Sequence, residues 1–234
     1  MHRAAVVVAM AVIAAITGFV APSAAQPVDQ QQISRFLGSP SYKSVLNRAL
    51  AQIRPDIFVR CANLRSTGAR VFFYKPITFA ADGAPNAGAW KQLIPVAGCG
   101  NDTVLNIIFV VHPDEKINFL LLLPGTTRAD PTLQRDALVE VMPGPTMYAA
   151  THGKKEDCKQ FDITNTRFGG YGNTLVNPAI PDPGPNDHYR PWWETWTLSG
   201  CGRAYDVSVA FTPTKNRPGT DITVPGNRVV ELSR

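Results

Sequence analysis

Two stretches of the chain that lie 102 residues apart place apolar residues at every second position. In the later stretch, large apolar residues alternate with small or polar ones, which predicts a strand with one buried face. The apolar positions are Tyr205, Val207, Val209 and Phe211. In the earlier stretch, 103–110, both faces are apolar, which predicts a strand covered on both sides. Either the first copy supplies the central strands of the fold, or the two copies meet at this strand.

The same step of 102 residues relates prominent residues on both sides of these strands. The matched pairs are Pro76 with Pro178, Trp90 with Trp192, Cys99 with Cys201 and Phe109 with Phe211. The spacing predicts two tandem homologous repeats, 26–125 and 126–234, which either fold separately or form one continuous globular domain. Each repeat is expected to contain a helix and about four mostly antiparallel strands, closed by one disulfide. The predicted fold class is therefore α+β.

Both repeats open with the same signal for the start of a helix. Ser39-Pro40 and Asp130-Pro131 each place a capping side-chain oxygen before a proline, and proline suits the first position of a helix. Each helix is expected to end shortly before the next proline, Pro55 or Pro143. A shorter helix over 29–37 is expected to precede the first one.

The remaining strands are expected to be short and separated by loops rich in proline and glycine. Loops are predicted over 76–88 and 178–191, because proline interrupts the hydrogen-bond ladder of a sheet. The predicted strands are 57–64, 71–74, 121–125, 158–168, 223–226 and 229–232.

The N-terminus has the three parts of a secretory signal peptide. A basic end at Arg3 precedes an apolar run over 4–20, and small residues follow up to Ala25. We expect cleavage after Ala25 and a soluble periplasmic or secreted product; an uncleaved N-terminal anchor is the alternative. No later stretch is long enough to span a bilayer, since the longest apolar candidate, Ile117–Leu123, suits a buried strand.

Four cysteines in an exported chain predict two disulfides. Each repeat has one cysteine early and one in a Gly-Cys-Gly sequence, so the preferred pairing is Cys61 with Cys99 and Cys158 with Cys201. The crossed pairing, Cys61 with Cys201 and Cys99 with Cys158, would mean that the repeats are interdigitated. Zinc binding and a nucleophilic thiolate are disfavoured, because there is no Cys-x-x-Cys sequence and no odd cysteine.

The charge pattern gives no support for nucleic-acid binding. The formal net charge is +5, and loss of Arg3 with the signal peptide lowers it to +4. The basic residues are scattered apart from Lys154-Lys155, so no stripe of charge follows a phosphate backbone. A preference for anionic envelope polymers stays open.

The chain contains no local motif for hydrolysis, for metal binding or for a calcium loop, and no cofactor is expected. The glycine-rich sequence 168–172 lacks the strand-to-helix context of a phosphate-binding loop. His112 and His152 are typical of surface turns. Paired carboxylates for glycoside hydrolysis leave no local signature, so a hydrolase stays an alternative.

The candidate binding residues are Trp193, Tyr189 and His188. Along the strand that begins at Trp192, Trp193 points away from Trp192 and Trp196 and shares a face with threonine and serine residues. An aromatic ring on such a face, near Tyr189, is able to stack on a sugar or anchor a protein. His188 lies in the same proline-rich loop beside a carboxylate, and a catalytic role would need further partners.

The sequence as a whole favours a soluble exported protein that works as a non-catalytic binding or envelope-associated module, with a protein or a glycan as ligand. The first alternative is a hydrolase of an envelope polymer or a secreted substrate, with its active groups in a groove between the repeats. The second is a secreted inhibitor or effector that binds another protein.

Overall fold

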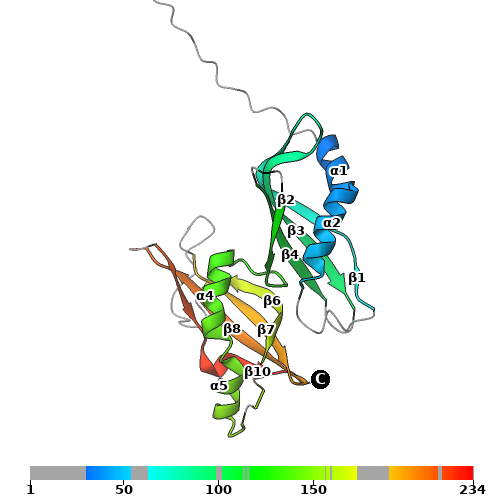
Figure 1. Ribbon diagram of the computed structural model, residues 1–234. Coiled ribbons are helices and arrows are strands. Elements are labelled where there is room, and N and C mark those ends of the chain that lie inside the picture. Colours follow the sequence, from blue (N-terminus) through cyan, green and yellow to red (C-terminus); the bar gives the residue numbers. More distant parts are fainter. Residues whose placement is uncertain are drawn as a thin grey trace, which may run out of the picture.

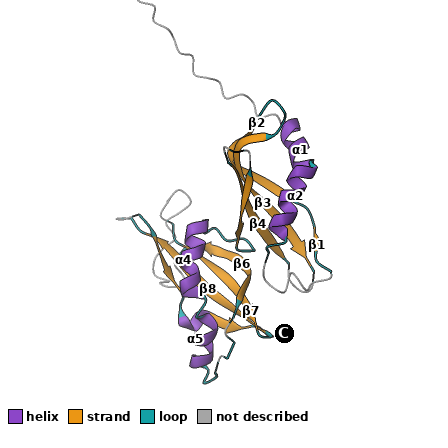
Figure 2. Cartoon of the chain, viewed as in Figure 1, coloured by secondary structure: helices purple, strands orange, loops and turns teal. Residues whose placement is uncertain are grey.

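The computed structural model describes residues 30–53, 63–98, 102–112, 114, 116–155, 157–158, 160–172, 190–215 and 218–233. In this part of the chain two antiparallel sheets follow one another, and helices cover one face of each (Figures 1 and 2). The protein therefore has the predicted α+β composition. The interpretation of its two halves as homologous repeats stays a prediction.

The first half places two helices before a five-stranded sheet. The helices are α1 (Gln30–Gly38) and α2 (Pro40–Leu50). The strands are β1 (Arg65–Ser66), β2 (Arg70–Phe79), β3 (Pro85–Ala97), β4 (Thr103–Val111) and β5 (Ile117–Leu122). The long strand β3 pairs with β1 and β2 along one side and with β4 along the other, and β5 completes the sheet beside β4.

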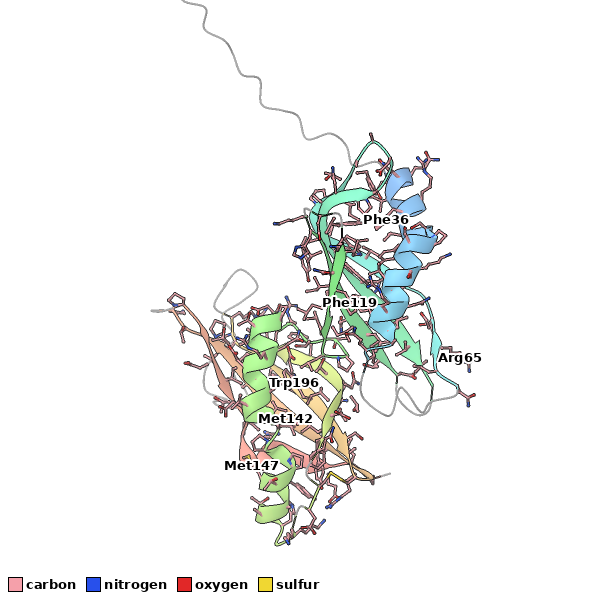
Figure 3. The ribbon with its side chains drawn as sticks, viewed as in Figure 1. Phe36, Arg65, Phe119, Met142, Met147 and Trp196 are labelled. Atoms are coloured by element: carbon pink, nitrogen blue, oxygen red, sulfur yellow. A yellow bond between two sulfur atoms is a disulfide. The ribbon has the colours of Figure 1, made fainter. Side chains whose placement is uncertain are left out.

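Aromatic side chains fill the space between these helices and their sheet. Trp90 of β3 lies directly opposite Phe109 of β4, and their stacked rings are 5.4 Å apart. Tyr42 of α2 and Phe36 of α1 pack on this pair, with the Phe36 ring edge-on to Trp90 at 5.8 Å (Figure 3). All four side chains are buried, so the apolar stripe of each helix meets the Trp-containing face of the sheet.

The second half also places two helices before a five-stranded sheet. The helices are α4 (Pro131–Val141) and α5 (Gly144–Thr151). The strands are β6 (Asp162–Tyr171), β7 (Trp192–Gly200), β8 (Arg203–Pro213), β9 (Thr220–Thr223) and β10 (Val229–Glu231), with a 3-10 turn, η1 (Gly226–Arg228), before the last. The order in this sheet is β10, β8, β7, β6, and β9 also pairs with β8.

The second core contains the matching aromatic pair. Trp192 of β7 lies opposite Phe211 of β8, and their stacked rings are 4.8 Å apart. Trp196 and Val207 are fully buried beside them. Gly144 at the start of α5 lies so close to Val207 that a Cβ atom there would overlap its side chain, so the glycine lets this helix approach the sheet.

The predicted helix caps are confirmed. The Ser39 hydroxyl accepts a hydrogen bond from the backbone N–H of Tyr42 at 3.2 Å. The Asp130 carboxylate accepts from the backbone N–H groups of Thr132 and Leu133 at 2.8 and 3.0 Å. These bonds satisfy donors that the first turn of a helix leaves unpaired.

The two halves are joined by hydrogen bonds at the segment that follows β5. The backbone N–H of Thr126 donates to the Thr166 carbonyl at 2.7 Å, and the Thr166 hydroxyl donates to the Pro124 carbonyl at 2.7 Å. Gly125, with a φ of 107°, passes so close to the Thr166 backbone that a Cβ atom would overlap it. A glycine is therefore required where the chain crosses from the first sheet to the second.

The predicted disulfide between Cys158 and Cys201 is confirmed, with their Cα atoms 5.8 Å apart. It ties the segment before β6 to the two-residue turn that joins β7 to β8. Cys201 occupies that turn with a positive φ of 47°, and Gly202 follows with a φ of 80°, which suits a tight hairpin. Cys61 and Cys99 lie outside the described residues.

Two predictions about the first sheet are wrong. The predicted loop 76–88 is mostly strand, because β2 continues to Phe79 and β3 begins at Pro85. Proline is tolerated there because β2 is an edge strand with breaks in its register. Strand 103–110 is also not covered along the whole of both faces, since Val110 is 38% exposed. The two halves form separate sheets, so the first half does not supply central strands to a common sheet. The alternative, that the halves meet at this strand, agrees with a hydrogen bond of 2.8 Å from the Thr103 hydroxyl on β4 to the Asn165 side chain on β6.

Most of the other predicted strands are present, but they begin or end at different residues from those predicted. Strand 71–74 belongs to the longer β2, 158–168 corresponds to β6, 121–125 to the end of β5, 223–226 to the end of β9 and 229–232 to β10. Most of the predicted strand 57–64 and most of the loop 178–191 lie outside the described residues.

In the described part, no helix is long and apolar enough to cross a membrane.

Candidate functional site

The residues that the sequence singled out on β7 lie on its two opposite faces. Trp192, Glu194 and Trp196 face the helices, and Trp193 lies on the other face between them. Trp196 is fully buried (Figure 3), whereas Trp192 is only partly buried. Trp196 is therefore part of the core, and Trp192 packs against its edge.

Glu194 is a fully buried carboxylate held by three N–H donors. Its Oε1 accepts from the Trp192 indole at 2.9 Å and from the backbone N–H of Arg128 at 2.8 Å. Its Oε2 accepts from the Trp196 indole at 2.8 Å. Within the described residues no cationic side chain pairs with it, so hydrogen bonds alone compensate its burial. This arrangement anchors the segment before α4 to the sheet.

Trp193 is half-buried on the outer face of the second sheet. It lies opposite Ala210 on β8 and Gly170 on β6. Its indole covers Gly169 so closely that a Cβ atom on that glycine would overlap the ring. The ring therefore packs on the glycine backbone, and only part of its surface is left for a ligand.

The polar residues near Trp193 are already hydrogen-bonded to one another. The Thr197 hydroxyl donates to Asp206 at 2.7 Å, and Arg167 donates to that hydroxyl at 3.1 Å. Arg167 also forms an ion pair with Asp206. Thr197, Asp206 and Arg167 thus bond to one another, which weakens the case for sugar recognition by these three side chains.

His188 and Tyr189 lie outside the described residues, so their predicted binding role is untested. Beside them in sequence, a cluster that the sequence reasoning missed forms around Tyr171. The guanidinium of Arg190 is 3.9 Å from the Tyr171 ring centroid, and that of Arg128 is 5.0 Å from it. Stacked arginine and tyrosine residues stabilise this end of the sheet through cation–π contacts.

The two described histidines have structural surroundings. The backbone N–H of His112 donates to the Lys116 carbonyl at 2.9 Å and closes the turn between β4 and β5. His152 ends α5, where its Nδ1 is 2.9 Å from the Tyr148 carbonyl and its ring stacks on Tyr148 at 4.0 Å. Both histidines are exposed, as expected for surface turns.

Strand β5 is an open edge of the first sheet. It pairs with β4 through six consecutive positions, Ile117–Leu122, and has no described strand on its other side. Its sequence carries neither a charged residue nor a proline, which are the usual protections of an exposed edge. Leu120 is 51% exposed. Among the described residues, no strand pairs with the outward N–H and C=O groups of β5.

A groove of about 750 Å³ lies at the C-terminal end of this edge. Consecutive residues, Leu120–Leu123, line it, so it adjoins the last part of β5 and the residue that follows the strand. The opposite wall is formed by one side of α4 and the start of β6. The apolar residues of that wall are Pro131, Leu138, Met142, Phe161 and Ile163. The groove is therefore an apolar channel next to a free backbone edge, assembled from both halves of the chain.

The polar side chains that line the groove differ in the hydrogen bonds and ion pairs that they form. The Gln134 amide accepts from the backbone N–H of Leu123 at 3.0 Å and donates to the Ala129 carbonyl at 2.8 Å, so it fastens α4 to the end of β5. Arg135 is exposed and pairs with Asp136 at 3.2 Å. Asp162 lines the groove and forms no ion pair with a described residue.

A sequence signal for this site was present. Between Lys116 and Arg128 the chain has no charged residue, which is unusual for a segment that includes an edge strand. The apolar run was interpreted as a buried strand, because its place in the strand order depends on pairings far apart in the sequence. The sequence reasoning therefore predicted the strand and missed its exposure.

Within the described ranges, no group of three His, Cys, Asp or Glu side chains is arranged to hold a metal ion. No model of a known protein family matches the chain, and neither the curated proteins nor the solved structures contain a match to it. Inferences about function therefore rest on the geometry of this molecule.

Proposed function

We propose that the protein is an exported, non-catalytic binding module in which an extended apolar segment of a partner polypeptide adds to the free edge of β5. One observation carries this proposal: the apolar groove adjoins the C-terminal part of the β5 edge, which pairs with no other described strand, and has a second wall formed by α4 and the start of β6. Strand addition combines main-chain hydrogen bonds with pockets for alternate side chains, and both are supplied here.

A polypeptide fits this site better than a compact small molecule. Only another extended backbone offers a ladder of donors and acceptors that matches the edge of β5, at a spacing of about 4.8 Å. Because α4 closes the far side of the groove, one added strand fits there more readily than the edge of a second sheet. The ligand is therefore expected to be a flexible segment and not a folded domain.

The walls of the groove define the chemistry of that segment. The aliphatic lining selects apolar side chains at alternate positions. Asp162 places one carboxylate in the lining, so a basic residue at the adjoining end of the segment would add a complementary charge. The proposed ligand is an uncharged, apolar, extended segment flanked by a Lys or an Arg.

The alternative functions make different demands on the same groove. Hydrolysis of a glycan by paired carboxylates needs two acidic groups that face each other, whereas Asp162 is the one acidic side chain among the described residues lining the groove. We therefore prefer the binding function. An inhibitor or effector would use the same strand addition, and identification of the partner separates these cases. Trp193 remains the competing binding residue.

A fluorescent dodecapeptide of alternating valine and threonine with lysine at both ends tests the proposal by fluorescence anisotropy. We expect saturable binding, and at least a tenfold loss of affinity when Met142→Lys places a charge in the groove. Val139→Lys is the matched control, because Val139 is on the same helix, is 74% exposed and does not line the groove. Equal affinity of the two variants would refute the site.

A second pair of variants tests the edge of the strand itself. Leu120→Lys adds a charge to β5 and is expected to weaken binding of the same peptide, whereas Val110→Lys adds it to the neighbouring inner strand and is expected to leave binding unchanged. Trp193→Ala is also expected to bind like the wild type. If Trp193→Ala were the only variant that lost binding, the binding site would be the outer face of the second sheet and not the edge of β5.

We also propose that the two halves are homologous repeats. In both, the tryptophan that begins the pattern pairs with a phenylalanine 19 positions later: Trp90 with Phe109, and Trp192 with Phe211. Two positions after each tryptophan a polar side chain is buried, Gln92 in one half and Glu194 in the other. A shared register and a shared buried polar position support duplication of one α+β unit.

The glycine before each Gly-Cys-Gly cysteine supports the same proposal. Gly98 approaches the Asn63 backbone so closely that a Cβ atom would overlap its carbonyl, and Gly200 approaches Gln160 in the same way. In each half the approached residue follows the early cysteine by two positions. We therefore retain the prediction that Cys61 pairs with Cys99, and non-reducing peptide mapping would test it.

Export is proposed from the N-terminal signal and agrees with the Cys158–Cys201 disulfide, because such bonds persist in oxidising compartments. N-terminal sequencing of the mature protein is expected to begin at Gln26. A mature protein that still carries residues 1–25 would favour the uncleaved anchor.

A further inference from the structure

The edge strand β2 exposes three aromatic side chains in succession. Phe72 is 51% exposed, Phe73 is 40% exposed and Tyr74 is 60% exposed. Successive residues of a strand point to opposite faces, so the rings project on both sides of the edge instead of joining one core. The register is broken between Phe73 and Lys75, which places Tyr74 at an irregular point of the edge.

Basic residues enclose this aromatic segment. Arg70 and Lys75, both exposed, stand at its two ends. Lys91 of β3 lies directly opposite Phe72, and partial burial lowers the pKa of its amine. From 57 to 81 the sequence contains four basic residues and no acidic one. Aromatic rings flanked by Lys and Arg, without acidic neighbours, match the interface of a membrane with anionic lipids.

The excess positive charge of the protein also belongs to this half. Residues 26–125 contain ten Lys and Arg against six Asp and Glu, whereas residues 126–234 contain twelve of each. The first half therefore carries the whole net charge of the chain after its signal peptide. An anionic surface would attract the half that bears the aromatic edge.

The apolar outer face of the first sheet continues from this edge. Phe72, Lys91, Ile108 and Leu120 lie opposite one another in a single row across β2, β3, β4 and β5. Lys91 forms no ion pair with a described residue, so packing of this face on a second copy of the chain would bury its charge without a countercharge, which is costly. A surface with negative headgroups supplies the countercharge instead.

We propose that the aromatic edge of β2, together with the adjoining outer face of the first sheet, docks the protein on an anionic phospholipid surface. The rings lie at the level of the headgroups, and Arg70, Lys75 and Lys91 meet the lipid phosphates. Attachment is peripheral and reversible, because a few half-inserted rings and three charges give a weak anchor. This proposal does not depend on the peptide site at β5.

Co-sedimentation of the protein, purified after export, with vesicles of phosphatidylglycerol and phosphatidylcholine tests this docking. Binding is expected to rise with the phosphatidylglycerol fraction, to be weak on pure phosphatidylcholine and to fall between 0.1 and 0.5 M salt. Arg70→Gln with Lys75→Gln is expected to lower the partition constant by roughly 25-fold, at about fivefold for each charge. The control, Arg135→Gln with Lys155→Gln, removes two exposed charges from the other half and is expected to bind like the wild type.

The aromatic contribution is tested separately. Phe72→Ser with Tyr74→Ser is expected to lower binding to the same vesicles at least tenfold, since both rings lose their apolar contact with the lipid. Val230→Ser, at a 54% exposed residue of the second sheet, is the control and is expected to have no effect. Thermal melts check that every variant is folded. Equal binding to both lipids, or unchanged binding by the Arg70/Lys75 or the Phe72/Tyr74 double variant, would overturn the proposal.

Discussion

Replacing Glu194 with glutamine keeps the shape of a fully buried side chain and changes its charge and one of its acceptors. Oε1 accepts from two N–H donors and Oε2 accepts from one. The amide oxygen of the glutamine is expected at the position of Oε1, where it keeps both donors. Its NH2 group then faces the indole N–H of Trp196, so that two donors oppose each other in the core.

The cost follows from these three hydrogen bonds. A buried donor left without an acceptor costs about 1–3 kcal/mol, and each of the other two bonds loses about 1 kcal/mol when its acceptor becomes neutral. Relief from burying a charge offsets part of this loss. We therefore expect Glu194→Gln to lower the free energy of unfolding by about 2–4 kcal/mol, which shifts Tm by roughly 4–16 °C in a chain of this size.

Urea unfolding followed by tryptophan fluorescence measures this change, because three of the four tryptophans belong to β7. Glu140→Gln, at an exposed position of α4, is the matched control and is expected to change stability by no more than about 0.5 kcal/mol. If Glu194→Gln were as stable as this control, the carboxylate would not be the acceptor for the buried donors, and the reasoning would be refuted.

Three further predictions concern the framework. Burial raises the pKa of Tyr42 to about 12, so its contribution to stability is complete below pH 10 and is lost as the pH rises through 12, by up to roughly 3 kcal/mol; Tyr42→Phe should remove this alkaline step from urea titrations. Cys158→Ser with Cys201→Ser opens a link across 43 residues and should lower the free energy of unfolding by about 4 kcal/mol in urea. Gly125→Ala should lower it by about 3 kcal/mol or more in thermal melts, whereas Gly153→Ala, which also has a positive φ but faces open space, should cost about 1 kcal/mol.

Local features of the fold could be predicted because they depend on neighbouring residues. The caps at Ser39 and Asp130 follow from a side chain that reaches donors two or three residues ahead. The alternation along β8 follows from the period of a strand, and all its predicted inward residues are buried; the outward Ala210 is buried as well, opposite Trp193. The pairing of Cys158 with Cys201 was inferred from the position of each cysteine in its repeat and is confirmed.

The candidate peptide site could not be predicted in the same way. Its walls come from β5, α4 and β6, and these elements meet only because Gly125 and Thr166 join the two halves closely. The sequence of β5 is equally compatible with a central strand, since apolar residues on both faces are typical of burial. Only the strand order shows that β5 is an edge.

By itself, the sequence was sufficient to predict the α+β composition, the helix starts and the core-facing side of β8. It also predicts the export signal, which stays a prediction. These depend on the identity of residues and on periods of two or of about 3.6 positions. The tertiary structure alone decided which apolar residues stay exposed, at β2 and along β5, because exposure depends on the neighbours that distant segments supply. Both proposed binding surfaces arise from that difference.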